Sequence, residues 1–229
     1  MSLILNIDTA VETGSVSLSI DGELQQSRSN ENQKDHASWI HGAIHDMIQV
    51  AGFTMKDLDA VAVSNGPGSY TGLRIGLSAA KGICFALQIP LITIATLEIM
   101  AEAARNQVND GLIEKTDWLC PMIDARRMEV YYAVYDPELL LIHPPQAANA
   151  DDAIFSALVE KKKVLFFGNG SFKVRNTLVH DNAFFTDNVK PGASDMISLS
   201  NRYYRQNKLA DLAYAEPLYI KEFYSPLRK

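Results

Sequence analysis

The fold of this chain is predicted best from one stretch, Asn65-Gly66-Pro67-Gly68-Ser69-Tyr70-Thr71-Gly72-Leu73-Arg74-Ile75-Gly76. The apolar run before it, residues 60–63, predicts a buried strand, and the long apolar segment after it predicts a helix over residues 71–87. Gly66 and Gly68 flank Pro67, so the turn between strand and helix has its φ set at the proline and can take positive φ on either side. The sequence therefore predicts a strand–turn–helix unit here.

Two further glycines, Gly72 and Gly76, fall inside the predicted helix, where each costs about 1 kcal/mol relative to alanine. Together with Ala80 and Cys84 they form a row of small residues at spacing four, which places them on one helix face. Such a face allows another helix or a ligand to approach unusually closely. Ordinary packing on the chain's own core accounts for the same pattern, so both interpretations stay open.

The stretch does not match either common phosphate-binding motif. No Gly-Lys-Ser or Gly-Lys-Thr follows the glycines, and the nearby cation, Arg74, already lies one turn into the helix. The glycine spacing also differs from that of the dinucleotide-binding fingerprint.

The charge balance indicates that the chain alone is a poor nucleic-acid binder. The chain has 229 residues, with 27 acidic and 21 basic side chains and a net charge of −6. Neutralisation of phosphates supplies most non-specific affinity for nucleic acids, so a partner is expected to carry the positive surface.

Two cysteines, Cys84 and Cys120, lie in apolar surroundings without CxxC spacing, which is typical of reduced core residues in a cytosolic protein. The N-terminus has no basic region of a signal peptide. The longest apolar run, residues 83–100, is broken by Gln88 and Pro90, and we expect no membrane span.

The chain divides into two halves that start alike. Residues 1–105 and 118–229 are predicted as two subdomains, with residues 106–117 as the linker. The first half is predicted to contain strands at 3–7, 15–20, 23–27, 60–63 and 91–94, and helices at 37–51, 71–87 and 96–105. The second half is predicted to contain strands at 119–124, 129–135 and 164–167, helices at 151–159 and 195–207, and a terminal segment, 217–221, that returns to the core.

Each half opens with an apolar strand that ends in aspartate, at Asp8 and at Asp124, followed by a hairpin. This weak duplication predicts an α/β fold of the actin-like ATPase type (ASKHA, ribonuclease H-like), with two subdomains of mixed sheets flanked by helices. The fold resemblance implies a vestigial nucleotide cleft, with these candidate residues: Asp8, Thr9, Asp124, Gly168, Asn169 and Gly170.

The sequence resembles the TsaB (YeaZ) family in four places: Asp8-Thr9, the glycine block 66–76, Ala79-Ala80-Lys81-Gly82 and Asp124-Ala125-Arg126. The resemblance implies a non-catalytic scaffold subunit, required with TsaD and a TsaE-like ATPase to add threonylcarbamoyl to the adenosine next to the tRNA anticodon. It also implies a cytoplasmic protein that carries no cofactor alone, with ATP or ADP bound within the complex. It reaches tRNA only through the complex, and forms a homodimer when isolated.

The chain departs from the paralogue TsaD where TsaD places two metal-binding histidines at spacing four. The matching positions here are Thr96 and Met100, neither of which suits a catalytic metal. The chain also lacks HExxH, GxSxG and a paired Cys/His arrangement, so the "glycoprotease" label of this superfamily finds no support in its residues.

Two enzymatic alternatives remain. A small actin-fold ATPase or kinase would use Asp8 and Asp124, but Asp124 precedes Ala-Arg-Arg and not a glycine-rich turn that cradles phosphate. A metal-dependent hydrolase would use His41 and His45, one helix turn apart, but a third ligand is missing.

We expect helices 37–51 and 71–87 to contact the same two helices of a partner, either a TsaD-like paralogue or a second copy. The predicted interface residues are Trp39, Ile40, Gly72, Leu73, Gly76, Ala80 and Cys84. If they are exposed, Gly76→Leu gives a folded monomer that no longer dimerises. If the small-residue row packs on the chain's own sheet, Gly76→Leu unfolds the chain.

Overall fold

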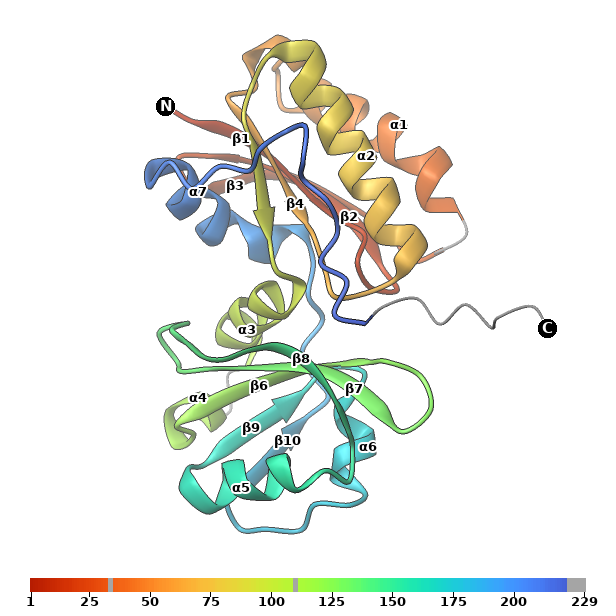
Figure 1. Cartoon of the computed structure of the whole chain (residues 1–229). Coiled ribbons are helices and arrows are strands. Elements are labelled where there is room, and N and C mark those ends of the chain that lie inside the picture. Colours follow the sequence, from red (N-terminus) through yellow and green to blue (C-terminus); the bar gives the residue numbers. More distant parts are fainter. Residues whose placement is uncertain (33–34, 109–110, 222–229) are drawn as a thin grey trace, which may run out of the picture.

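The computed structural model describes residues 1–32, 35–108 and 111–221, which form two stacked halves (Figure 1). The first half is a five-stranded sheet of β1 (Leu3–Asp8), β2 (Gly14–Ile20), β3 (Glu23–Asn30), β4 (Ala60–Ser64) and β5 (Leu91–Ile94). Its order is β3-β2-β1-β4-β5, in which β1, β2 and β3 are antiparallel neighbours and β1, β4 and β5 are parallel ones.

The second half repeats this arrangement. Its strands are β6 (Trp118–Asp124), β7 (Glu129–Tyr135), β8 (Leu141–Asn149), β9 (Val164–Phe167) and β10 (Ala183–Thr186), in the order β10-β9-β6-β7-β8. In both sheets the first strand pairs antiparallel with the second and parallel with the fourth. The predicted duplicated α/β fold of the actin-like ATPase type is confirmed.

Helices cover both faces of the first sheet. Side chains alternate between the two faces along each strand, so neighbouring residues belong to different cores. Leu3, Leu5 and Ile7 pack with α1 (His36–Val50) and α2 (Tyr70–Leu87), whereas Ile4 between them belongs to the core on the opposite face. That core also contains residues of α3 (Thr96–Gln107) and α7 (Ile197–Arg205).

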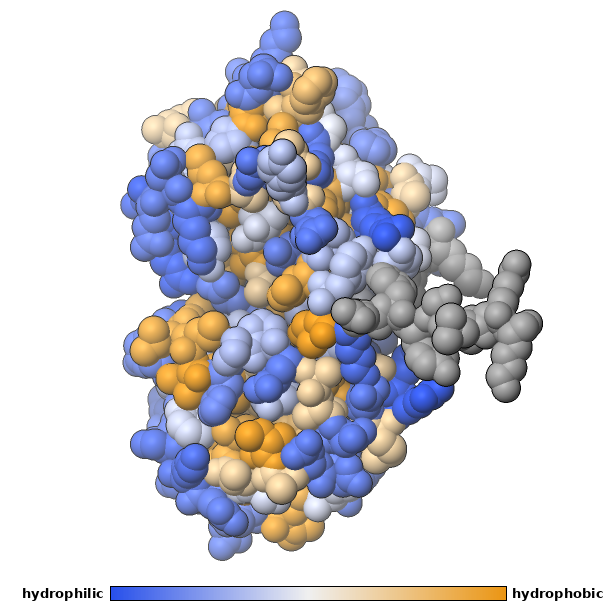
Figure 2. All heavy atoms as spheres, viewed as in Figure 1, coloured by the Kyte–Doolittle hydropathy of each residue, from blue (hydrophilic) through white to orange (hydrophobic). Residues whose placement is uncertain are grey.

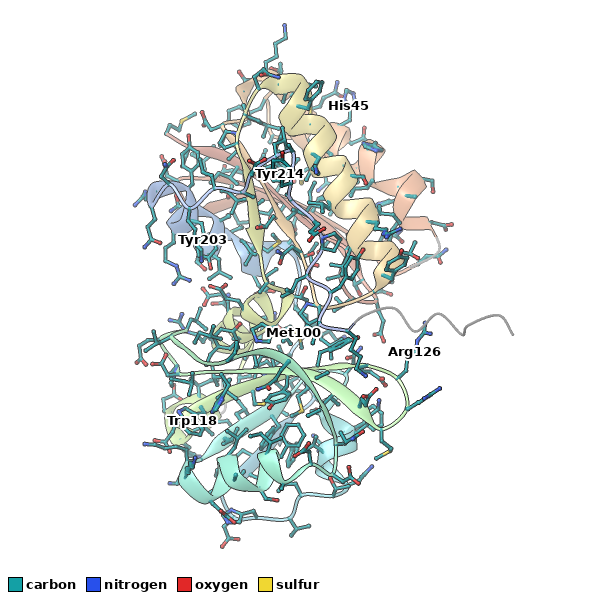
Figure 3. The ribbon with its side chains drawn as sticks, viewed as in Figure 1. His45, Met100, Trp118, Arg126, Tyr203 and Tyr214 are labelled. Atoms are coloured by element: carbon teal, nitrogen blue, oxygen red, sulfur yellow. The ribbon has the colours of Figure 1, made fainter. Side chains whose placement is uncertain are left out.

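Helices α3 and α7 join the two halves. Helix α3, in the predicted first subdomain, contacts β6 and β7 of the second sheet, and α7, in the predicted second subdomain, contacts β1 and β5 of the first. Met100 of α3, labelled in Figure 3, is buried in this shared core. The surface narrows beside these helices, between the two halves (Figure 2).

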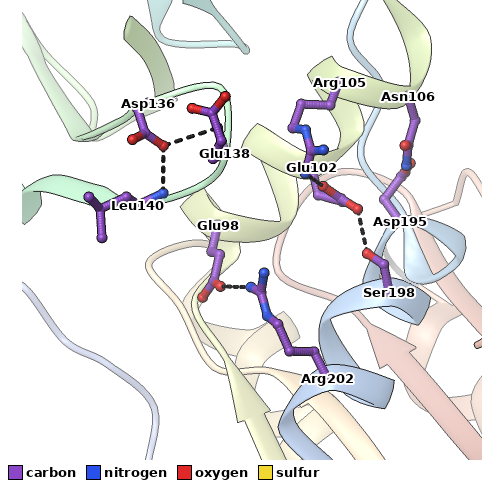
Figure 4. Close-up of polar contacts among 10 residues, drawn as sticks. All are labelled: Glu98, Glu102, Arg105, Asn106, Asp136, Glu138, Leu140, Asp195, Ser198 and Arg202. Carbon is purple, nitrogen blue, oxygen red and sulfur yellow. Dashed lines mark hydrogen bonds and ion pairs between the residues drawn. The ribbon is translucent and has the colours of Figure 1, made fainter.

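A polar network also ties α3 to α7 (Figure 4). Arg202 of α7 donates to Glu98 of α3 at 3.1 Å, and the Tyr203 hydroxyl donates to Glu98 at 2.8 Å. Ser198 donates to Glu102 one turn further along α3. These bonds satisfy carboxylates that the apolar core would otherwise desolvate without compensation.

The predicted elements are found with ends shifted by a few residues, but some elements are missing from the prediction. Strand β8 contains His143-Pro144-Pro145, and it lies at the edge of its sheet, where proline is best tolerated. Strand β10 and helix α6 (Ser171–Arg175) were also missing from the prediction, and both are very short. Helix α4 (Leu112–Lys115) lies in the segment predicted as the linker. Residues 109–110 of that linker fall outside the described residues. The remaining elements are α5 (Ala153–Lys161) and two 3₁₀ turns, Met55–Asp57 and Ala193–Met196; the latter begins the predicted helix 195–207. Among the helices described, none combines the length and apolar character needed to cross a membrane.

Candidate functional site

The glycines of α2 allow this helix to lie directly on the segment after β1. A Cβ atom added at Gly72 would collide with the Thr9 carbonyl oxygen, and one added at Gly76 would collide with the Thr9 hydroxyl. That hydroxyl instead donates to the Gly72 carbonyl at 2.7 Å. The glycine spacing is therefore explained by contacts within the chain.

The rest of the small-residue row is buried in the same way. Leu73, Ala80 and Cys84 have exposed fractions of 1%, 0% and 0%. Burial raises the pKa of the Cys84 thiol to about 11. The prediction that Gly72, Leu73, Gly76, Ala80 and Cys84 form a partner interface is wrong, because the chain's own sheet covers this face of α2.

The opposite face of α2 forms an open groove with α1. It has a volume of about 890 Å³. Apart from its own helix turn, no heavy atom comes within 4 Å of a Cβ built on Gly82, a residue of the groove wall. Of the predicted interface residues, Ile40 lines this groove from its buried side, and Trp39 packs half-buried against the core beside it. The groove is lined by Ala37, Ile40, His41, Met55, Tyr70, Thr71, Arg74, Ile75, Ser78, Ala79, Gly82, Ile83, Ala86 and Leu87.

The first candidate nucleotide residues lie inside the protein. Asp8 and Thr9 are fully buried. The Asp8 carboxylate accepts from the Ser64 hydroxyl at 2.7 Å and from the Ala10 amide at 3.0 Å. Burial raises the pKa of Asp8, against the lowering effect of these bonds and of His36. A group so placed cannot reach a metal ion in the cleft.

Asp124 and Asn169 do lie at a cleft between the halves, with a volume of about 800 Å³. Lys173, itself buried, donates to Asp124 at 2.6 Å, and Asn169 accepts from the Asp124 amide at 2.9 Å. Burial acts to raise the pKa of Asp124, but Lys173 and the Arg126 amide outweigh it, so the net pKa is lowered. Lys173 thus neutralises the carboxylate that a metal would need.

The predicted Gly168-Asn169-Gly170 turn is also packed against the chain itself. A Cβ on Gly168 would collide with Met100 and the Met122 carbonyl, and one on Gly170 would lie 2.8 Å from the Ile123 carbonyl carbon. The backbone of β6, and not a ligand, occupies the space that these glycines leave. The residues therefore do not fit a magnesium–nucleotide complex, and the structure separates Asp8 and Thr9 from Asp124 and Asn169.

The histidine pair lies on the outer side of α1. His41 lines the groove, and His45 is exposed near the outer end of the first half (Figure 3). Within residues 1–32, 35–108 and 111–221, no group of three or more His, Cys, Asp or Glu side chains is placed to hold a metal ion.

Two features of the cleft were not predicted from the sequence: the pairing of Lys173 with Asp124, and the position at the cleft of the C-terminal segment, which was predicted only to return to the core. Lys173 occurs in a short helix without an apolar pattern, and the partner residues of the C-terminal segment are about 90 to 150 positions away in the sequence. The apolar residues Leu218, Tyr219 and Ile220 were the signal that this segment returns to the core.

Replacing Asp8 by asparagine is expected to stabilise the chain at pH 7. The amide oxygen can accept the same two hydrogen bonds, and the cost of burying a charge is removed. Because the folded-state pKa of Asp8 is raised, its contribution to stability is fully present below the unfolded-state pKa of about 3.9 and is lost as pH rises through the folded-state value. Urea unfolding of Asp8→Asn at several pH values should show a smaller loss of stability above about pH 4.

Asp124→Asn is expected to have the opposite effect and to be less stable than wild type at pH 7. The folded-state pKa of Asp124 is lowered, so the contribution of this carboxylate to folding stability is present above the unfolded-state pKa and is lost as pH falls. A loss of stability at pH 7 in Asp8→Asn would contradict the first of these two predictions, because the charged Asp8 carboxylate would then be compensated inside the protein.

Comparison with known proteins places the chain in one family. The family model for TsaD, tRNA N6-adenosine threonylcarbamoyltransferase, matches residues 29–223. The tRNA threonylcarbamoyladenosine biosynthesis protein TsaB of Escherichia coli (strain K12) is 27% identical over 95% of this chain and 94% of its own length. TsaB of Bacillus subtilis (strain 168) is 31% identical over 72% of this chain and 70% of its own length.

Among solved structures, YeaZ from Pseudomonas aeruginosa superposes with a TM-score of 0.80 and 26% identity, over 96% of this chain and all of that chain. Another Pseudomonas aeruginosa structure, described as similar to the peptidase YEAZ, superposes with a TM-score of 0.81. Sequence and structure thus agree over nearly the whole chain, which belongs to the TsaB family and carries a TsaD-type domain.

Proposed function

We propose that this chain is a non-catalytic subunit in the synthesis of threonylcarbamoyladenosine in tRNA. The names of its relatives support the pathway, and the open groove between α1 and α2 is the observation that carries the subunit role. The described part of the chain offers an apolar docking surface, while its candidate catalytic carboxylates are buried or neutralised.

The groove is suited to a pair of helices from another protein. Ile75, Ile83 and Leu87 form apolar walls, and Gly82 leaves room on one side. The TsaD family model covers both α1 and α2, so a TsaD-like paralogue can present an equivalent pair of helices. A second copy of the chain can use the same patch, and pairing through one patch gives a two-fold symmetric dimer.

The catalytic steps are assigned to the partners. In this chain Asp8 is buried, Asp124 is paired with Lys173, and both cysteines are buried with raised thiol pKa values. ATP or ADP would then be bound in the complex, with a TsaE-like ATPase hydrolysing it, while the TsaD-like subunit transfers the threonylcarbamoyl group. The net charge of −6 supports tRNA contact through the assembled complex. The reduced, buried cysteines support a cytoplasmic location.

A reconstitution experiment tests this proposal. Purified TsaD-like and TsaE-like partners, tRNA, ATP and a threonylcarbamoyl donor are incubated with and without the chain, and the modified adenosine is measured by mass spectrometry. We expect product when the chain is present and little or none when it is omitted. The chain alone should show no ATPase or peptidase turnover.

Two results would contradict the proposal. One is an equal yield of modified adenosine without the chain. The other is turnover by the chain alone near 1 s⁻¹, within the range of ordinary enzymes, that is abolished in Asp124→Asn.

A further inference from the structure

The C-terminal segment, residues 209–221, runs back from α7 across the first half to the cleft (Figure 1, blue). We name it the strap. It begins at the edge of the first sheet, where the Ala210 amide donates to the Leu91 carbonyl of β5 at 2.8 Å. Lys81 of α2 then donates to the carbonyls of Ala213 and Ala215 at 3.2 and 3.0 Å.

The strap next enters the turn between β4 and α2. The Leu218 amide donates to the Asn65 carbonyl at 2.6 Å. Gly66 has a φ of +116°, and a Cβ added there would lie 2.8 Å from the Leu218 carbonyl oxygen. The glycine block therefore accommodates the strap on one side, as it accommodates Thr9 and Ala10 on the other.

Tyr219 anchors the strap to the first turn of α2. Arg74 donates through Nε to the Tyr219 hydroxyl at 3.1 Å, and the Tyr219 ring lies 5.7 Å from the Tyr70 ring. The Arg74 guanidinium also lies 4.0 Å from the centre of the Tyr70 ring. The Tyr219 hydroxyl and ring thus both contact the first turn of α2, at Arg74 and Tyr70.

The strap ends on the second half. Lys221 forms an ion pair with Glu129 of β7, with both side chains about one-third exposed (34% and 33%). Leu218, Tyr219, Ile220 and Lys221 line the cleft together with Asp124 and Asn169. One short segment thus contacts both halves at the cleft, on the other side of the narrowing from α7 (Figure 1).

We propose that the strap, which forms one wall of this cleft, keeps the two halves in one relative position. The hinge side is held by α3, α7 and their polar network, and the strap closes the open side. At this cleft, Asp124 is paired with Lys173, and Gly168 and Gly170 pack against the chain itself.

The relative position of the halves can be measured with spin labels. Gln49→Cys on α1 and Ser156→Cys on α5 provide exposed helical sites in different halves. The native Cys84 and Cys120 are fully buried with raised thiol pKa values, so they react slowly with the label. In this background, Tyr219→Ala with Lys221→Ala removes both side-chain anchors. Tyr214→Ala is the matched control, since this strap tyrosine is 84% exposed (Figure 3).

We expect one narrow distance distribution for the labelled parent and for Tyr214→Ala, and a broader, longer one for the double variant. Hydrogen exchange at the Leu218 amide should be at least about tenfold faster in the double variant, which reports release of the strap. Faster exchange with an unchanged distance distribution would overturn the proposal, because the released strap would then not hold the halves. Unchanged exchange would also overturn it, because Tyr219 and Lys221 would then not anchor the strap.

Discussion

Gly76→Leu is expected to unfold this chain or to leave it barely stable. The space beside Gly76 is filled by Thr9, Val63 and Ile7, so a leucine side chain has to push α2 away from the first sheet. Overpacking of this kind costs about 1–3 kcal/mol or more, and folded domains are stable by only about 5–15 kcal/mol. The displaced helix would also break the bond from the Thr9 hydroxyl to the Gly72 carbonyl.

Circular dichroism with thermal and urea unfolding measures this effect. Gly82→Leu serves as the control, because it places the same side chain in the same helix at a position where no atom outside the helix turn lies within 4 Å of the new Cβ. A Gly76→Leu chain with wild-type stability would show that α2 does not lie on the sheet as described. It would restore the earlier expectation that the small-residue row faces a partner.

The second large effect is expected for Gly82→Leu on partner binding. The leucine enters the groove between α1 and α2 and occupies space that the partner helices are proposed to use. Truncation or blocking at the centre of an interface costs about 2 kcal/mol or more, so the affinity for a TsaD-like partner should fall by at least about 30-fold. The chain itself should stay folded, with its helix favoured by up to about 1 kcal/mol, because leucine replaces a helical glycine.

Calorimetry with the TsaD-like partner, and light scattering for the isolated chain, measure both kinds of association. Gly42→Leu is the matched control: Gly42 is also helical with nothing within 4 Å, but it does not line the groove. If Gly82→Leu binds the partner as tightly as wild type, the groove is not the docking site, whatever the role of the chain in the pathway.

Several parts of the fold follow from local physical chemistry. Apolar runs bounded by turn residues predicted β1, β4, β5, β6 and β9 within a residue or so, because buried strands need little besides continuous apolar side chains. Apolar residues at helical spacing predicted α1 and α2. Strand β8 escaped prediction, because two adjacent prolines argue against a strand. They are accommodated because β8 lies at the sheet edge, and edge position is a property of the assembled sheet.

The candidate site was predicted less well, because its residues were chosen by type and spacing and not by exposure. Asp8 and Asp124 occupy matching places in the duplicated halves, yet one is buried beside Ser64 and the other is paired with Lys173. Which of two equivalent carboxylates reaches the cleft depends on the elements that cover each strand end, and these come from distant parts of the sequence.

The sequence by itself determined that one face of α2 must be approached closely, since Gly72 and Gly76 carry a helix-propensity cost that only close contact offsets. It also indicated that the two halves open alike, each with an apolar strand that ends in aspartate and leads into a hairpin. Only the tertiary structure decided that the close neighbour of α2 is Thr9 of the same chain, that the open groove lies on the opposite helix face, and that residues 209–221 return to the cleft. Spacing along a helix defines which side chains share a face, whereas the identity of what covers that face depends on contacts between residues far apart in the chain.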